Sequence, residues 1–142
     1  MAGNGNMTRF GISADQRLLE DFDSLIRKEG YVNRSEAIRD MIRNQLVKRN
    51  WENDNKETIG TINLVYKHGL RKLTEKIAEL QHHNHTHIIS SLHVHLDNDR
   101  CFEVLVVKGT SLQIREVADK LIGIKGVIHG NLSMSTTGKD LY

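Results

Sequence analysis

The first third of the chain decides the fold, and its residues 9–46 read RFGISADQRLLEDFDSLIRKEGYVNRSEAIRDMIRNQL. The first six residues of this stretch alternate polar and apolar side chains, which predicts a short strand with Phe10, Ile12 and Ala14 on one face. The opposite face of that strand carries Arg9, Gly11 and Ser13.

Two helices are predicted after this strand. Leucine, isoleucine and phenylalanine recur at helical spacing, with Ser13 or Asp15 as the N-terminal cap and Gly30 as the end. Asn33, followed three positions later by Glu36, forms a capping box that begins the second helix. The inner face of that helix is an apolar stripe of Ala37, Ile38, Met41, Ile42 and Leu46.

A strand and two helices of this size are not expected to be stable alone, because a single edge strand leaves its backbone groups unpaired. In two copies the strands can pair into an antiparallel ribbon and the four helices can form a core. Such a ribbon has the size to enter the major groove of DNA. We therefore expect residues 1–50 to be a ribbon-helix-helix DNA-binding domain, an intertwined dimer with a disordered N-terminal tail. A module that only dimerises is the alternative.

A second domain is expected at residues 58–142, after a polar linker at residues 51–57. Its patterns predict strands at 58–67, 88–96, 101–107 and 126–136, with helices at 70–81 and 112–122. This βαββαβ order predicts an α+β, ferredoxin-like domain, in which both helices cover one face of a four-stranded antiparallel sheet. A second copy is the simplest cover for the other face.

Histidines and the one cysteine indicate a metal site on two of these strands. His93 and His95 point the same way, because residues two apart in a strand share a face. If residues 97–99 form a hairpin loop, His95 faces Cys101 and His93 faces Glu103. The apolar residues of opposite parity are then expected to face the core; they are Leu92, Val94, Leu96, Phe102, Val104 and Val106. The histidines and the cysteine would lie on the face away from that core.

Two imidazoles and a thiolate suit nickel, copper or zinc, and Glu103 could orient one of the histidines. A fourth ligand could come from a neighbouring subunit, from the cluster His82, His83, His85 and His87. Thiolate ligation predicts that metal binding releases protons and weakens at low pH. A zinc hydrolase would also need a general base and a substrate cleft, which nothing beyond Glu103 suggests, so we expect no enzyme.

Charge and composition add modest support. The chain has 142 residues and a net charge of +2, and residues 1–50 carry nine basic against seven acidic side chains. The excess of positive charge therefore lies in the expected DNA-binding segment. A single cysteine, a start without signal-peptide features and the lack of a long apolar run predict a cytoplasmic protein that does not enter a membrane.

Several motifs together resemble the nickel-responsive regulator (NikR) family. They are Gly30-Tyr31, the run NRSEAIRD at 33–40, QHH at 81–83, LHVH at 92–95 and Cys101. The resemblance implies an ACT-like regulatory domain, a homotetramer built as a dimer of dimers, and one Ni(II) per subunit in a planar site of three nitrogens and one sulfur. By position, one subunit would supply His93, His95 and Cys101, and its partner would supply His82.

The resemblance also implies further contacts. The base-contacting positions of the ribbon would be Arg9, Gly11 and Ser13, and Arg71 would touch the DNA backbone. Gly11 stands where the family has a hydroxyl residue, and it has no side chain with which to read a base. Glu36 and Asp40 match positions that the family uses for a hard cation such as potassium, although a solvated helix face would look the same.

These features predict a nickel-dependent regulator that represses nickel-uptake genes, in which Ni(II) bound at the tetramer interface promotes binding to double-stranded operator DNA. Two alternatives stay open. A metal-buffering or delivery protein would bind nickel without a DNA site, and a ribbon-helix-helix regulator controlled by a small molecule would not respond to nickel.

Overall fold

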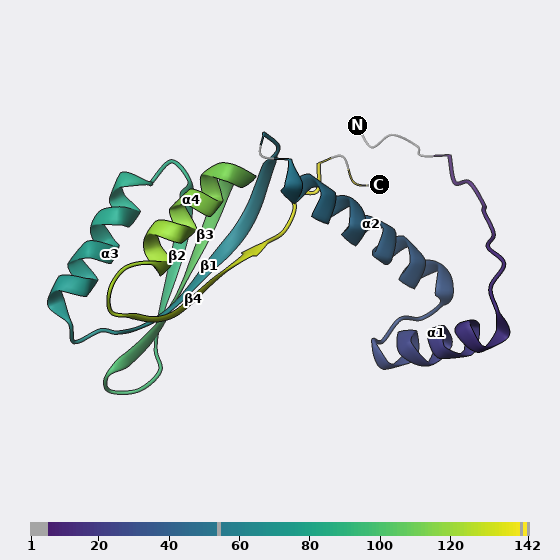
Figure 1. Ribbon diagram of the computed structural model, residues 1–142, viewed down its shortest axis with the longest axis horizontal. Coiled ribbons are helices and arrows are strands. Elements are labelled where there is room, and N and C mark those ends of the chain that lie inside the picture. The colour runs from purple at the N-terminus through teal and green to yellow at the C-terminus, as the bar shows by residue number, and fades with distance from the viewer. Residues whose placement is uncertain (1–5, 54, 140, 142) are drawn as a thin grey trace. The chain divides into compact units, whose positions relative to one another are not determined.

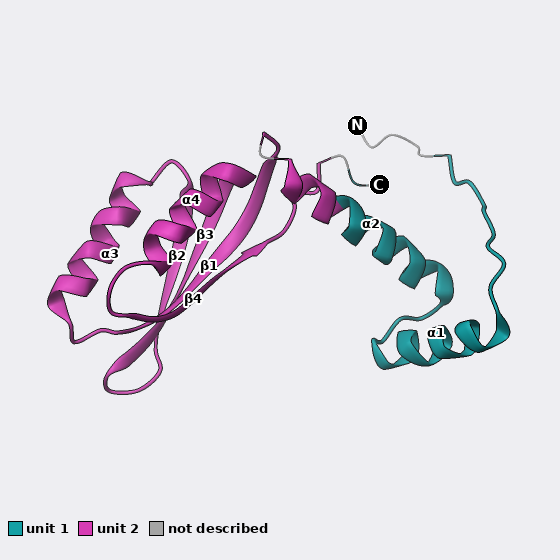
Figure 2. Ribbon diagram, viewed as in Figure 1, with its two compact units in different colours: residues 1–46, 140–142 teal, residues 47–139 magenta. Residues whose placement is uncertain are grey.

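The computed structural model describes residues 6–53, 55–139 and 141, which divide into two compact units (Figure 2). Unit 1 comprises Met1–Leu46 and Asp140–Tyr142, and unit 2 comprises Val47–Lys139. Residues 1–5 of the expected tail lie outside the described residues. The elements are α1 (Gln16–Lys28), α2 (Arg34–Glu52), β1 (Glu57–Lys67), α3 (Arg71–His83), β2 (Ile88–His95), β3 (Arg100–Thr110), α4 (Ser111–Ile122) and β4 (Val127–Met134) (Figure 1).

Both helices of unit 1 start where their capping residues predict. The side chain of Asp15 accepts a hydrogen bond from the backbone of Arg17 at 2.9 Å and caps α1. Gly30 follows the end of α1 with a φ of +82°, a left-handed conformation that a residue with a Cβ rarely adopts. The backbone N–H of Glu36 donates to the side chain of Asn33 at 2.9 Å, which satisfies one free donor at the start of α2.

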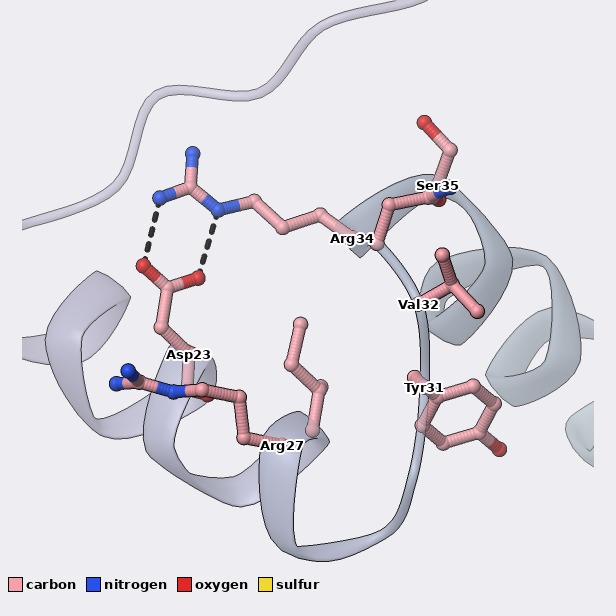
Figure 3. A pocket seen from close by; sticks show the side chains of 8 residues that line it. Asp23, Arg27, Tyr31, Val32, Arg34 and Ser35 are labelled. Carbon is pink, nitrogen blue, oxygen red and sulfur yellow. Dashed lines mark hydrogen bonds and ion pairs between the residues drawn. The ribbon is translucent and has the colours of Figure 1, made fainter.

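An ion pair joins α1 to the start of α2. The carboxylate of Asp23 accepts hydrogen bonds from Nε and Nη2 of Arg34, both at 2.7 Å, and this pairing holds the pKa of Asp23 below its usual value. The pair lies on the wall of a cavity of about 580 Å³ at the turn between the helices (Figure 3). Val32 lines the same cavity and is 91% exposed. A single copy therefore leaves apolar surface uncovered at this turn.

The predicted strand at residues 9–14 is not formed in the single chain, since residues 6–15 are neither helix nor strand. A strand needs the backbone hydrogen bonds of a neighbouring strand, and for this segment the expected neighbour is a second copy. The apolar side chains of the segment and of the α2 stripe are correspondingly exposed; they are Phe10, Ile12, Met41, Ile42 and Leu46. Unit 1 of one chain thus presents an incomplete core.

Unit 2 has the predicted ferredoxin-like architecture, with helices α3 and α4 packed on one face of the sheet (Figure 1). The strand order is β2-β3-β1-β4, and neighbouring strands are antiparallel. Helix α2 extends to Glu52 and β1 begins at Glu57, so regular structure occupies both ends of the segment predicted as a linker. None of the described helices is long and apolar enough to cross a membrane.

The face of the sheet on which the core lies differs from the prediction. The core lies between the sheet and its two helices, and the sheet contributes Ile62, Leu64, Tyr66, Cys101, Leu105 and Val107. The side chains predicted for the core point away from the helices: Phe102, Val104 and Val106 are half-buried, Leu92 is 62% exposed and Val94 is 40% exposed. The predicted ligands were grouped on one face correctly, but that face is the one that the helices cover.

The physical reason is that β3 is largely apolar on both faces. Alternation shows which residues share a face, but it does not show which of two apolar faces the helices will cover. Glu103 was predicted to lie on the face away from the core, yet it is only 5% exposed. Its burial is possible because both carboxylate oxygens find hydrogen-bond donors beneath the helices.

Candidate metal centre

Strands β2 and β3 bring the central pair of predicted ligands into direct opposition, with His95 facing Cys101. The backbone N–H of Leu96 donates to the carbonyl of Arg100 at 2.9 Å, which makes Leu96 and Arg100 a hydrogen-bonded pair. Pairs alternate along antiparallel strands, so the next pair, His95 and Cys101, is a non-hydrogen-bonded pair. In such pairs the Cα atoms approach to about 4.5 Å and the side chains are closest. The ring of His93 lies 5.2 Å from that of His95, centroid to centroid.

The hairpin loop at residues 97–99 holds this register. Oδ1 of Asp97 accepts hydrogen bonds from the backbone of Asp99 at 3.0 Å and of Arg100 at 2.7 Å, and the guanidinium of Arg100 binds Oδ2. These hydrogen bonds, that of the Arg100 side chain above all, lower the pKa of Asp97 to about 2. The hydrogen bonds of Asp97 therefore stabilise the loop locally, as is typical of a tight turn that begins with Asp.

The thiol of Cys101 is fully buried, and Sγ donates a weak hydrogen bond to the carbonyl of Tyr66 at 3.4 Å. Burial raises the pKa of Cys101 above its ordinary value. The thiol is thus protonated at neutral pH in the chain alone. A metal that bound Sγ would have to displace this proton.

Glu103 is connected to His93 through the hydroxyl of Tyr66. Its Oε2 accepts a hydrogen bond from the hydroxyl of Tyr66 at 2.6 Å, and its Oε1 accepts one from Nε2 of Gln81 at 2.6 Å. The hydroxyl of Tyr66 also lies 3.5 Å from Nδ1 of His93. Burial, and then the hydrogen bond to Glu103, raise the pKa of Tyr66 far above its usual value. The hydroxyl therefore stays protonated between Glu103 and His93.

Sequence reasoning missed three residues beside this site: Tyr66, Gln81 and His68. The ring of His68 meets that of His95 edge-on, with centroids 4.8 Å apart, and its Nε2 is buried without a hydrogen-bond partner among the described residues. Tyr66 faces Cys101 in the pairing of β1 with β3. Local patterns could not have found Tyr66 or His68, because the pairing of β1 with β3 joins segments far apart in the sequence. Gln81 reaches the site from α3, 22 positions before the Glu103 carboxylate that it binds.

His82 lies in the last turn of α3 with an exposed side chain. Its ring is 6.2 Å from the rings of both His83 and His85, centroid to centroid. Within the part of the chain that the structure describes, no three His, Cys, Asp or Glu side chains are close enough together to hold a metal ion. The two imidazoles and the thiol of β2 and β3 nevertheless fit a metal of the nickel, copper or zinc type by donor chemistry. They would hold it with a further ligand from outside this group.

The residues predicted to contact DNA belong to both units. Arg9, Gly11 and Ser13 are exposed in the segment before α1. A Cβ added at Gly11 would meet no atom within 4 Å, so packing in the single chain does not require glycine there. Arg71 opens α3 in unit 2, where its Nε donates to Glu75 at 2.9 Å.

The two carboxylates predicted for a hard cation already have partners. Glu36 forms an ion pair with Arg39, one turn along α2. Oδ2 of Asp40 accepts a hydrogen bond from the hydroxyl of Tyr31 at 2.6 Å, and this bond raises the pKa of Tyr31. A potassium site at these residues stays a prediction.

Comparison with known proteins covers both units. Residues 59–135 match the NikR C terminal nickel binding domain, and residues 8–49 match the ribbon-helix-helix protein, copG family. Relatives from Geobacter metallireducens and Geobacter sulfurreducens are each 54% identical over 138 residues, and one from Geotalea uraniireducens is 56% identical. Each alignment covers 97% of this chain and 99% of the relative, and each relative is named "Putative nickel-responsive regulator". The chain therefore belongs to the nickel-responsive regulator (NikR) family, whose members are regulators with a ribbon-helix-helix and a nickel-binding domain.

Proposed function

We propose that this protein is a nickel-dependent repressor of nickel-uptake genes, which binds operator DNA when nickel occupies its regulatory domain. The observation that carries the proposal is the opposition of His95 and Cys101, with His93 alongside, within the segment that matches a nickel-binding domain. One Ni(II) per subunit would be held by these three side chains and by His82 of the partner subunit. The bound metal would therefore join two subunits, because its ligands come from both of them.

The surrounding residues would orient the ligands. The hydroxyl of Tyr66, held by Glu103, lies 3.5 Å from Nδ1 of His93 and would help to fix the orientation of that ring. Gln81 binds the other oxygen of the same carboxylate and directly precedes His82 in α3. Through Tyr66 and Gln81, the Glu103 carboxylate therefore connects His93, a proposed ligand of the subunit's own nickel site, with the turn of α3 that carries His82. That His82 would bind the nickel of the partner subunit.

The incomplete surfaces of the chain support an assembly of subunits. The unpaired segment before α1 and the exposed apolar stripe of α2 support a dimer through unit 1. In unit 2, the sheet face opposite the helices exposes Leu92 and Val94, which supports a second contact between subunits. Two different contacts of this kind build a dimer of dimers.

A titration of promoter DNA upstream of the protein's own gene or of a neighbouring transporter gene tests the function. One equivalent of nickel per subunit is expected to tighten binding by about 5- to 150-fold, the usual range of coupling between two sites. Copper and zinc serve as the comparison metals. Nickel binding without a protected DNA segment would favour the buffering protein, and DNA binding that ignores nickel would favour control by a small molecule.

Replacement of Arg9 by alanine is expected to weaken operator binding by about 5- to 150-fold, because a bidentate contact from arginine to a guanine contributes roughly 1–3 kcal/mol of discrimination. Nickel affinity should stay unchanged, since Arg9 lies in unit 1 and the metal ligands lie in unit 2. DNA titration with nickel present measures the effect. Lys125→Ala, which removes one positive charge from an exposed position of unit 2, is the control. Equal operator affinity of Arg9→Ala and the wild type would exclude the contact.

A further inference from the structure

The last turn of α2, which belongs to unit 2, is held within that unit by hydrogen bonds that converge on Trp51. Its backbone carbonyl accepts hydrogen bonds from Oγ of Ser111 and from Nη2 of Arg115, both at 2.7 Å. Its indole Nε1 donates to the carbonyl of Ser135 at 2.8 Å. We call these four residues the Trp51 clamp.

The clamp satisfies groups that would otherwise lack partners. The last carbonyl oxygens of a helix have no backbone N–H donor within that helix. The carbonyl oxygen of Trp51 instead accepts hydrogen bonds from side chains in the first turns of α4. The hydroxyl of Ser111 is fully buried, so its hydrogen bond to Trp51 is shielded from competing water. Oγ1 of Thr58 donates at 2.7 Å to the same Ser135 carbonyl that the indole binds. The end of α2 is therefore held from both α4 and the segment after β4.

The clamp also stands at the end of the strand that carries Cys101. Strand β3 runs from Arg100 to Thr110, a length of roughly 30 Å, and Ser111 follows directly. On the other side, α2 is a continuous helix from Arg34 to Glu52 that begins in unit 1 and ends in unit 2. Cys101 is thus connected to α2 by strand β3, by Ser111 at the start of α4, and by the hydrogen bond from the Ser111 hydroxyl to the Trp51 carbonyl.

We propose that the Trp51 clamp is the joint through which nickel occupancy acts on the DNA-binding half of the chain. A change in the regulatory domain on metal binding passes along β3 and α4 to the last turn of α2, and α2 carries it into unit 1. The clamp residues are positioning residues: their three hydrogen bonds join α2, α4 and the segment after β4, and none of these three bonds involves a proposed metal ligand or the ribbon segment. This inference rests on the proposed function. It predicts that release of the clamp leaves both halves competent and uncouples them.

Two mild variants test the clamp in the full-length protein. Trp51→Phe removes the indole donor, and Ser111→Ala removes the buried hydroxyl donor. Nickel affinity, and operator affinity without nickel, are expected to stay within about threefold of the wild type. The tightening of operator binding by one nickel equivalent, about 5- to 150-fold for ordinary coupling, is expected to fall below about threefold in both variants.

Glu52→Gln, at the exposed neighbouring position of the same helical turn, is the matched control and should keep the full nickel effect. Thermal unfolding of each variant checks that the fold is retained. A full nickel effect in both clamp variants would overturn the inference, and so would a parallel loss of nickel affinity, since the clamp would then act on the metal site itself. A wild-type protein whose operator binding ignores nickel would instead overturn the proposed function, and the inference with it.

Discussion

Replacing Cys101 with alanine is expected to lower nickel affinity by more than about 100-fold, because loss of a direct ligand should exceed the 10- to 100-fold effect of losing an outer hydrogen-bond partner. The chain contains a single cysteine, so Cys101 is the one side chain that can supply a thiolate ligand. Competition against a chelator of known nickel affinity measures the loss. Nickel binding to Cys101→Ala should also release far fewer protons than nickel binding to the wild type.

The fold should survive this substitution. Cys101 packs in the core of unit 2, and removal of one buried sulfur atom costs on the order of 1 kcal/mol. Ser91→Ala is the matched control: Ser91 lies on β2, with the same parity as His93 and His95, and faces Leu105 across the strand pair. It should bind nickel as the wild type does. Unchanged affinity in Cys101→Ala would move the metal away from β3 and towards the histidine cluster at the end of α3.

Mixing two defective variants should restore tight nickel sites if each site is shared between subunits. Cys101→Ala and His82→Ala are each expected to lack tight binding alone. In a mixed assembly, the His82→Ala subunit still has its own His93, His95 and Cys101, and the Cys101→Ala subunit can supply His82. Each boundary between the two variants then holds one complete site and one that lacks two ligands.

Nickel stoichiometry after joint refolding, with subunit exchange followed by native mass spectrometry, measures this complementation. Up to half of the sites at mixed boundaries should bind tightly. The matched control mixes Cys101→Ala with His95→Ala, a combination in which no subunit keeps all three strand ligands, and it should restore none. Failure of the first mixture to regain sites would place all ligands within one subunit. Wild-type affinity of His82→Ala alone would remove His82 from the ligand set.

Local sequence determined the elements and the register of the candidate site. Helix α1 begins after Asp15, as its capping pattern predicts, because a cap is made by residues within one turn of each other. His95 faces Cys101 because a three-residue loop sets the pairing of the strands that it joins. Period-two alternation placed His93 and His95 on one face for the same reason. Each of these relations spans only a few residues of the chain.

Tertiary structure decided what those patterns leave open. Strand β3 offers two apolar faces, so only the packing of α3 and α4 selected the one that carries Cys101. Glu103 could be buried there because Gln81 and Tyr66, 22 and 37 positions away in the sequence, donate to its carboxylate. The ribbon segment at residues 9–14 depends in turn on a partner that one chain does not contain. The physical reason is common to all three: a buried polar group, or an unpaired strand, is stable only when distant segments supply its hydrogen bonds, and periodicity in a sequence records only near neighbours.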